Sequence, residues 1–401
     1  MKKKILFITE SPPFPLDSGG NIKTYHTLRE LNKEFEVYLF FLCKEVPSTT
    51  VLSELSNVAS HVTFFKHSLI LNRVKTRPLW LINNYLHVRP YLFAQYYHPQ
   101  IKVQLSEILG AFYPDIIHID RFSMSQFLPL EKKQIWILES QNIESDITKG
   151  IAAYGKSFSQ RIFYFLETAL IKKQEKKYFP VFDHIFSLSI GEKKRLLQFY
   201  PNLNITVQKM KLDFFPHYRN FQANTLNGNS LLFVGNFDWY PNEDGMRWFI
   251  SEVFPLVLRE QPRTELHIVG MNSRKLLSHL TSHQVFCYGY QKNLKPFFAH
   301  ASIFVSPIRI ASGIRFKILT ALKSNLPVVS TRLGLYGLVY DPSSYLVADT
   351  AQEFADAVVK LLTRSKLKKK LICNAQRYLK QNFRESFLSE YQTIIDELTL
   401  G

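Results

Sequence analysis

The stretch ASIFVSPIRIASGIRFKILTALKSNLPVVST, residues 301–331, has the clearest alternation of strand and helix patterns in the sequence. Its apolar run Ile303–Val305 is typical of a strand that is buried on both faces of a parallel sheet. A loop starts at Pro307, Ser312 is a favoured helix N-cap, and apolar residues then recur at helical spacing. A second strand follows from Val328. The pattern predicts a strand–loop–helix–strand unit, which is the repeating element of an α/β fold.

Two cations, Arg315 and Lys317, fall in the first turn of the predicted helix. They are poorly placed for the helix itself, because the N-terminal end of the helix dipole is already positive. A bound anion would remove this penalty, since free backbone N–H groups and both side chains would converge on it. The alternative is that the two side chains point into solvent.

The order Pro-x-Arg-x-x-x-Gly-x-Arg-x-Lys-x-Leu at residues 307–319 is followed by Leu-Pro-Val-Val-Ser-Thr. It resembles the donor-binding segment of the group 1 (family 4) glycosyltransferases, which have the GT-B fold. The resemblance implies that the helix start faces the diphosphate of a nucleotide-sugar. Thr320 stands where relatives usually carry a Glu that holds the ribose. Ser312 stands where many carry a second Glu that contacts the sugar.

A glycine loop near the start of the chain resembles the acceptor-side loop of the same family. The string SPPFPLDSGGNIKTYHTLREL, residues 11–31, follows an apolar strand and opens a helix. A strand, a glycine turn and a helix let a ligand approach the backbone at the helix N-terminus. The resemblance therefore assigns Gly19, Gly20 and Asn21 to the acceptor side. A dinucleotide fingerprint is absent, because the glycines do not follow the Gly-x-Gly-x-x-Gly order.

Two further strands, at 114–120 and 135–138, end in polar residues, and ligands bind at this edge of open α/β sheets. His118 lies on the first, where a satisfied core histidine is the alternative to a site residue. Relatives have His-Asn where this chain has Gln141-Asn142. Gln donates and accepts hydrogen bonds but takes no proton. We expect Gln141 and Asn142 to border the reaction centre.

The turn GNFDWYPNEDG, residues 235–245, resembles the family's turn at which a glycine lets the nucleotide approach the backbone. The resemblance assigns to the donor side Gly235, Asn236, Asp238, Arg309, Ser312, Gly313, Arg315, Lys317 and Thr320. It assigns catalytic roles to Gln141, His118, Arg315 and Lys317. No metal and no cofactor are expected, because two cations and a helix N-terminus can stabilise a departing diphosphate electrostatically.

At 401 residues the chain exceeds the usual size of one core, so two domains are expected. We predict an acceptor-side domain at 1–215, a linker at 216–229 and a donor-nucleotide domain at 230–380. The resemblance implies an α/β chain with two Rossmann-like domains facing each other across a cleft. It also implies that the C-terminal helix, 381–401, crosses back to the first domain.

The net charge of +17 is compatible with nucleic acid, an anionic membrane surface or anionic substrates. No nucleic-acid module signature is present, so we expect no nucleic-acid partner. Residues 69–100 interleave aromatic and cationic side chains, which suits a membrane interface; helices that pack on their own domain are the alternative. Three dispersed cysteines give no disulfide framework. We expect a cytoplasmic protein, either free or peripheral on the inner face of the plasma membrane.

The leading hypothesis is a retaining, metal-independent hexosyltransferase that moves a sugar from a nucleotide-sugar to a glycan or lipid-linked acceptor, in cell-surface polysaccharide or glycoconjugate synthesis. The alternative is a catalytically silent GT-B protein that binds a partner glycosyltransferase or a glycan, which the substitutions at Ser312, Thr320 and Gln141 favour. A GT-B epimerase would need acidic or histidine catalysts, of which the assigned positions show few.

Overall fold

The computed structural model describes residues 2–67, 84–129, 131–218 and 228–400. The chain forms two compact units, Met1–Lys209 with Ser386–Gly401, and Met210–Glu385. The C-terminal residues from Ser386 onward therefore group with the first unit. Most of the predicted linker, residues 219–227, lies outside the described residues.

The first unit contains a seven-stranded sheet in which every pair of neighbouring strands is parallel. In spatial order the strands are β3 (His61–Lys66), β2 (Glu36–Cys43), β1 (Lys4–Thr9), β4 (Ile116–Ile119), β5 (Ile135–Ser140), β6 (His184–Ser187) and β7 (Ile205–Val207). Its helices are α1 (Gly19–Glu34), α2 (Thr49–Ser56), α5 (Tyr91–Ala94), α6 (Pro99–Phe112), α7 (Glu144–Tyr154), α8 (Phe158–Tyr178), α9 (Ile190–Phe199) and α17 (Leu388–Leu400). Short 3-10 turns follow β4 (η1, Phe122–Phe127) and α8 (η2, Phe179–Val181).

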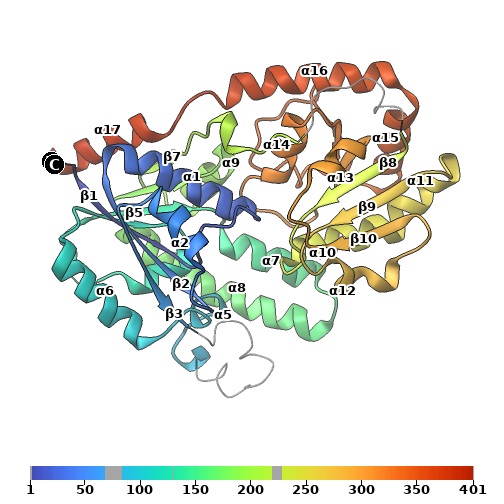
Figure 1. The fold of residues 1–401 in the computed structure, drawn as a ribbon. Coiled ribbons are helices and arrows are strands. Elements are labelled where there is room, and N and C mark those ends of the chain that lie inside the picture. The colour runs from blue at the N-terminus through green and yellow to red at the C-terminus, as the bar shows by residue number, and fades with distance from the viewer. Residues whose placement is uncertain (1, 68–83, 130, 219–227, 401) are drawn as a thin grey trace. The chain divides into compact units, whose positions relative to one another are not determined.

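Both faces of the sheet are buried at its central strand β1, which explains why that strand is a continuous apolar run rather than an alternating one. Leu6 and Ile8 of β1 belong to the core cluster that includes α6 and η1. Ile5 and Phe7 of the same strand belong to the cluster that includes α1, α2 and α17 (Figure 1). Successive side chains of a strand point to opposite faces, so one strand supplies both cores.

The second unit repeats the design with six parallel strands. They are, in spatial order, β10 (Val285–Gly289), β9 (Glu265–Val269), β8 (Ser230–Val234), β11 (Ile303–Ser306), β12 (Val328–Ser330) and β13 (Leu346–Val347). Its helices are α10 (Tyr240–Trp248), the π-helical turn η5 (Phe249–Val253), α11 (Phe254–Glu260), α12 (Ser273–Leu277), α13 (Lys295–His300), α14 (Phe316–Lys323), α15 (Ala351–Thr363) and α16 (Ser365–Asn382); 3-10 turns lie at η3 (Leu212–Phe214) and η6 (Ser278–Leu280). The prediction of an α/β chain with two Rossmann-like domains is confirmed.

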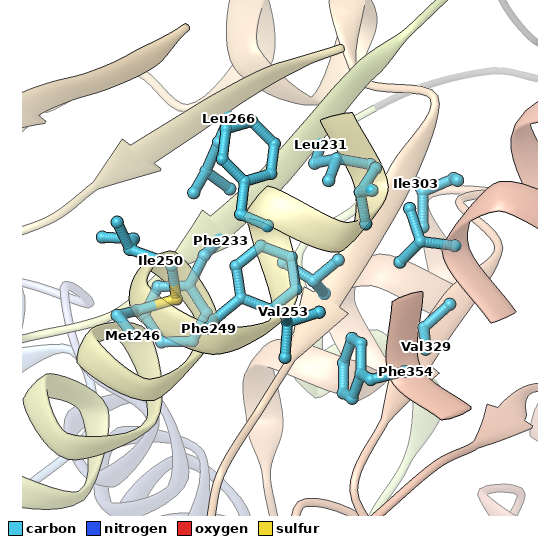
Figure 2. Close-up of a cluster of buried hydrophobic side chains, with 14 of the residues drawn as sticks. Leu231, Phe233, Met246, Phe249, Ile250, Val253, Leu266, Ile303, Val329 and Phe354 are labelled. Atoms are coloured by element: carbon cyan, nitrogen blue, oxygen red, sulfur yellow. The ribbon is translucent and has the colours of Figure 1, made fainter. Parts of the chain in front are cut away.

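The helix that runs from α10 through η5 to α11 covers one face of the second sheet. Figure 2 shows Phe233 of β8 and Met246 and Phe249 of this helix among the buried side chains of one cluster. Phe354 of α15 packs its ring against Phe249, with 5.5 Å between the ring centroids. This core fixes the turn between β8 and α10, where several predicted site residues lie.

The predicted start of the helix in the 301–331 stretch is wrong. The strands form as predicted, but α14 begins at Phe316 with Arg315 as its N-cap, not at Ser312. Gly313 has a φ of +74°, which a right-handed helix excludes. A Cβ on Gly337 would lie 2.8 Å from the Ile314 side chain, so the loop is held by close packing and not by helical hydrogen bonds.

No helix in the described ranges combines the length and the apolarity that a membrane crossing requires. The described part of the aromatic segment packs on its own unit. Tyr91 contacts Phe163, Phe93 stacks on Tyr178 and Tyr97 stacks on Phe127, with ring centroids 6.0–6.5 Å apart. Residues 68–83 of that segment lie outside the described residues.

A buried carboxylate, Glu175 of α8, holds the first turn of α7. Its Oε1 accepts a hydrogen bond from the Ser145 backbone N–H at 3.1 Å, and the residue is only 3% exposed. Carboxylates stabilise a helix N-terminus, but burial penalises the charge. Burial is the larger effect, and it raises the pKa of Glu175 to about 7.

We therefore expect Glu175 to favour the folded state at low pH. A raised carboxyl pKa contributes stability that is complete below its unfolded value, near 4.5, and is lost as pH rises through about 7. Glu175→Gln removes this titration, so the stability of wild type relative to the variant should fall by up to about 3 kcal/mol between pH ~5 and ~8. Urea unfolding at both pH values measures it. Glu107→Gln, an exposed change on α6, should show no such trend; the same trend there would contradict the assignment.

Gly270, directly after β9, has a φ of +143° and its α-carbon faces the Gly235 carbonyl. A Cβ at this position would overlap that carbonyl oxygen. Gly270→Ala should therefore cost about 3 kcal/mol or more, from backbone strain and steric overlap together. Thermal unfolding measures the loss. Gly110→Ala on α6 is the matched control: a Cβ there would have no neighbour within 4 Å, so the change should be neutral or stabilising by about 0.5–1 kcal/mol.

Candidate functional site

Each sheet has one position where the strand order reverses. In the first sheet β1 lies between β2 and β4, and in the second β8 lies between β9 and β11. Connections from neighbouring strands leave to opposite faces at such a point, and ligands of open α/β sheets bind there, outside the carboxyl ends of the strands. The predicted residues Gly235 and Gly20 both lie in the segments that follow these central strands.

In the second unit, Gly235, Asn242 and Lys317 form one contact group at the end of β8. Lys317 Nζ lies 2.5 Å from Asn242 Oδ1, and Asn242 Nδ2 donates to the Asn236 carbonyl at 2.6 Å. A Cβ on Gly235 would lie 2.9 Å from Asn242 Nδ2 and 3.0 Å from Lys317 Nζ. A side chain on Gly235 would therefore displace the lysine ammonium or the amide.

Lys317 is a cation with no carboxylate partner among the described residues. Its ammonium lies 4.2 Å from the centroid of the Phe233 ring. Burial, and secondarily the charge of Arg315, hold the pKa of Lys317 well below its usual range. An anion bound here would reverse both effects, because it would compensate the buried charge.

Arg315 fixes the loop before α14. Its guanidinium lies 4.7 Å from the centroid of the Trp239 ring and donates to the Ser312 carbonyl. The residue is only 7% exposed. Arg315 thus joins the loop after β8 to the loop after β11, and it contributes positive charge beside Lys317.

Arg309, predicted on the donor side, is neutralised within its own unit. It forms a two-point ion pair with Asp244 at 2.8 and 3.0 Å, and its guanidinium lies over the Trp248 ring. Bidentate pairs of this kind are strong and directional. Arg309 therefore connects the β11 loop to α10, while Arg315 and Lys317 are the cations that gather near Gly235.

The remaining donor-side residues shape the two loops. Asn236 Oδ1 accepts from the Asp238 backbone N–H at 2.9 Å, and Asp238 Oδ1 accepts from Asn272 at 2.6 Å. Ser312 and Thr320 are 1% and 7% exposed. Neither supplies a carboxylate, so the acidic positions of the family are replaced by buried hydroxyl groups.

Polar side chains of the first unit converge on Asp120, which follows β4 and is fully buried. Its carboxylate accepts hydrogen bonds from Thr9 at 2.8 Å, from Thr24 at 2.9 and 3.1 Å, and from Gln141 Nε2 at 2.9 Å. These donors come from the end of β1, from α1 and from the loop after β5. Asp120 was not predicted as a site residue, although it stood in the polar strand end at 114–120.

Gly20 lies against this network. A Cβ there would overlap the Arg121 guanidinium and would lie 3.4 Å from Gln141 Oε1. Arg121 Nε in turn lies 3.6 Å from Asp120 Oδ2. The glycine thus lets the arginine reach the N-terminal turn of α1, which begins at Gly19.

Asn21 and Asn142 hold the neighbouring loops. The backbone N–H of Asn21 donates to the Ser18 hydroxyl at 3.1 Å, and its side chain donates to Asp17 and to the Pro15 carbonyl. The Asn142 carbonyl accepts from Ser140 at 3.1 Å. Both predicted acceptor-side asparagines therefore lie in loops that their own contacts define.

His118 lies in the core of the first unit and does not reach its surface. It is fully buried on β4, stacks on Phe7 with ring centroids 4.6 Å apart, and bonds Tyr391 of α17 through Nδ1 at 3.1 Å. Burial, with a smaller effect of Lys23, holds the pKa of His118 well below its usual range. This geometry is that of the core histidine that we weighed as the alternative to a catalytic one.

Two buried charged residues that were not predicted from the sequence, Lys23 and Glu139, lie next to the hydrogen-bond network of Asp120. Lys23 of α1, 1% exposed, pairs with Glu139 of β5 and lies 4.0 Å from Asp120 Oδ1. Burial lowers the pKa of Lys23 to about 7, although Asp120 opposes the shift. Gln208 donates to both Glu139 and Thr27. The sequence signal that could have identified Lys23 is its position on the inward face of a predicted helix.

Among the described residues, no three His, Cys, Asp or Glu side chains are grouped as metal ligands.

Residues 228–364 match the family model described as glycosyl transferases group 1. An uncharacterized 44.6 kDa protein in the cps region of Klebsiella pneumoniae is 22% identical, with 95% of this chain and 96% of that protein covered.

Two solved structures have the same fold over almost the whole chain. Sucrose-phosphate synthase from Thermosynechococcus elongatus has a TM-score of 0.70 at 14% identity, with 100% of this chain and 98% of that chain covered. WaaG, a glycosyltransferase involved in lipopolysaccharide biosynthesis, has a TM-score of 0.66 at 15% identity, covering 98% and 99%. Residues 228–364 thus match the group 1 glycosyltransferase family, within a chain of GT-B fold, and the resemblance predicted from the sequence is confirmed.

Proposed function

We propose that the protein is a glycosyltransferase that moves a sugar from a nucleotide-sugar to a glycan or lipid-linked acceptor. The family match of the second unit supports this class of reaction, and the relative from a cps region and the likeness to WaaG support a place in surface polysaccharide or glycoconjugate synthesis. The observation that carries the proposal is the contact group of Gly235, Asn242 and Lys317, where a lysine with no carboxylate partner in the described ranges lies against the glycine at the end of β8.

This arrangement suits a diphosphate leaving group. As the bond between the sugar and the phosphate breaks, negative charge develops on the phosphate oxygens, and a preorganised cation stabilises it most where water is excluded. Lys317 would supply that charge, and Arg315 would add to it from the Trp239 side. In the proposed reaction neither a metal nor a cofactor is needed, the anomeric configuration is retained as in the family, and a hexose is the transferred group.

The acceptor side would work by positioning. Gln141 bonds Asp120 through its amide and takes no proton, so the departing phosphate would accept the proton of the acceptor hydroxyl. We propose a cytoplasmic site of action with an anionic membrane surface as a partner, since a lipid-linked acceptor would reside there.

A catalytically silent GT-B protein that binds a partner glycosyltransferase or a glycan is the second candidate. It is favoured by Ser312 and Thr320, buried hydroxyls at positions where the family carries carboxylates. Loss of one charge-assisted hydrogen bond to a ribose weakens binding by roughly 1.5–3 kcal/mol, which lowers affinity without abolishing transfer. The enzyme therefore remains the favoured hypothesis.

Nucleotide binding separates the two candidates. We expect one of UDP, GDP, ADP and CMP to bind in isothermal titration, and Lys317→Met to weaken that binding at least about tenfold, because one charge-assisted contact is worth roughly 1.5–3 kcal/mol. Arg315→Ala/Lys317→Ala should abolish it. Lys369→Ala/Lys370→Ala, two exposed changes on α16, should leave it unchanged.

A folded protein that binds none of these nucleotides would contradict the enzyme and favour the silent binder. Equal losses in the α16 control would show that net charge, and not the Lys317 position, governs binding.

The proposed metal independence has its own test. Titration of the bound nucleoside diphosphate in excess EDTA should give the same dissociation constant as in Mg²⁺, because side-chain cations neutralise the phosphates. A strong loss of affinity in EDTA, restored by a divalent cation, would contradict it.

A further inference from the structure

A basic pocket on the first unit lies apart from both sets of site residues. It has a volume of about 180 Å³ and lies between α5, α6, η1 and α8, the elements that cover one face of the first sheet (Figure 1). Its described lining includes Arg89, Lys102 and Lys177 with His87, and no Asp or Glu. We define these four residues as the basic pocket.

The three permanent cations of the pocket lack a counter-ion in the part of the chain that the structure describes. No carboxylate there lies within ion-pair distance of Arg89, Lys102 or Lys177, whereas Arg195 of the same unit pairs with Asp146 at 3.2 Å. Like charges that share a concave wall repel one another and raise the local concentration of anions. The pocket is therefore electrostatically incomplete without an anion.

Arg89 is held in place before any ligand binds. Its guanidinium lies 3.6 Å from the centroid of the Tyr97 ring, and Nη1 donates to Asn84 Oδ1 at 3.3 Å. A stacked guanidinium keeps further N–H groups in one plane for two-point contact with an oxyanion. Less conformational freedom is then lost when the ligand arrives.

The wall behind these cations is rigid. Gln126 of η1, 9% exposed, donates to the Phe93 carbonyl at 2.9 Å and to the Ser123 carbonyl at 3.0 Å. Gln174 of α8 donates to the Val88 carbonyl at 2.6 Å. These bonds join α8 and η1 to the backbone on either side of Arg89, so the fold fixes the backbone of the pocket wall.

We propose that the basic pocket binds the phosphate group of a small phosphate-bearing ligand. Its volume is below the roughly 300–1,000 Å³ of pockets for drug-sized ligands, so a nucleotide-sugar is too large whereas one phosphate with its first substituent fits. A free phosphate ester and a phospholipid headgroup share this chemistry. The proposal does not depend on sugar transfer.

The test compares two double variants of equal charge. Arg89→Gln/Lys177→Gln removes two pocket cations; Lys172→Gln/Lys173→Gln removes two exposed lysines of the same helix, α8, that do not line the pocket. Glycerol 1-phosphate binding is measured by titration. Vesicle binding is measured by flotation with phosphatidylcholine alone and with added phosphatidic acid. Circular dichroism establishes that each variant is folded.

If wild type binds glycerol 1-phosphate and the pocket variant binds at least about tenfold more weakly while the α8 control does not, the site takes a free phosphate ester. If only the vesicles with phosphatidic acid bind, with the same difference between variants, the ligand is a headgroup. Absence of binding in both assays, or equal losses in the two double variants, would overturn the proposal.

A charge-preserving variant separates preorganisation from net charge. Tyr97→Leu removes the ring beneath Arg89 and leaves every cation in place. It should weaken phosphate binding about threefold or more, because Arg89 then has to be ordered on binding. Unchanged binding would overturn the role assigned to the stacked arginine.

Discussion

Hydrogen bonds to the buried carboxylate of Asp120 hold together the loops at the carboxyl ends of the strands in the first unit. This carboxylate is an ion with no exposed surface, and it is retained because three hydrogen-bond donors and two nearby cations compensate it. Removing one partner from a buried charge network typically costs about 3–5 kcal/mol, since the remaining charge is left without compensation. Thr9, Thr24 and Gln141 are thereby fixed relative to one another, and Gly20 is the residue that leaves room for Arg121.

The charged residues near the end of β8 in the second unit are paired less completely than Asp120 in the first. Arg309 is balanced by Asp244, so that one positive charge is used to join the β11 loop to α10. Lys317 has the Phe233 ring and the Asn242 amide as neighbours and, among the described residues, no carboxylate. A fold that neutralises one cation and leaves another without a carboxylate partner in the described ranges places positive charge at the end of β8, where a parallel sheet presents its ligand-binding edge.

Most of the fold could be predicted from the sequence because its strands are apolar runs bounded by polar turns. The strands around Ile5, Val37, Ile303 and Val328 form close to their predicted bounds. The start of α14 could not be predicted, because it depends on two features that the local sequence does not show. Gly313 has a positive φ, and Gly337 packs against Ile314, which is distant from it in the sequence. Local helix signals at Ser312 were overridden by this tertiary packing.

The assigned site residues stay predictions, because sequence pattern and internal contacts answer different questions. Sequence pattern identifies which residues lie near a sheet edge, but it does not show which of them are engaged in internal pairs. His118 contacts Tyr391 and Phe7, and Gln141 bonds Asp120, so their hydrogen-bonding groups serve the fold. Lys23 was missed for the converse reason: a lysine normally lies in solvent, and only the carboxylates of Glu139 and Asp120 make its burial tolerable. A polar side chain therefore becomes a strong candidate for ligand binding only when its counter-charge is absent from the described part of the same unit, a criterion that Lys317 meets and Arg309 does not.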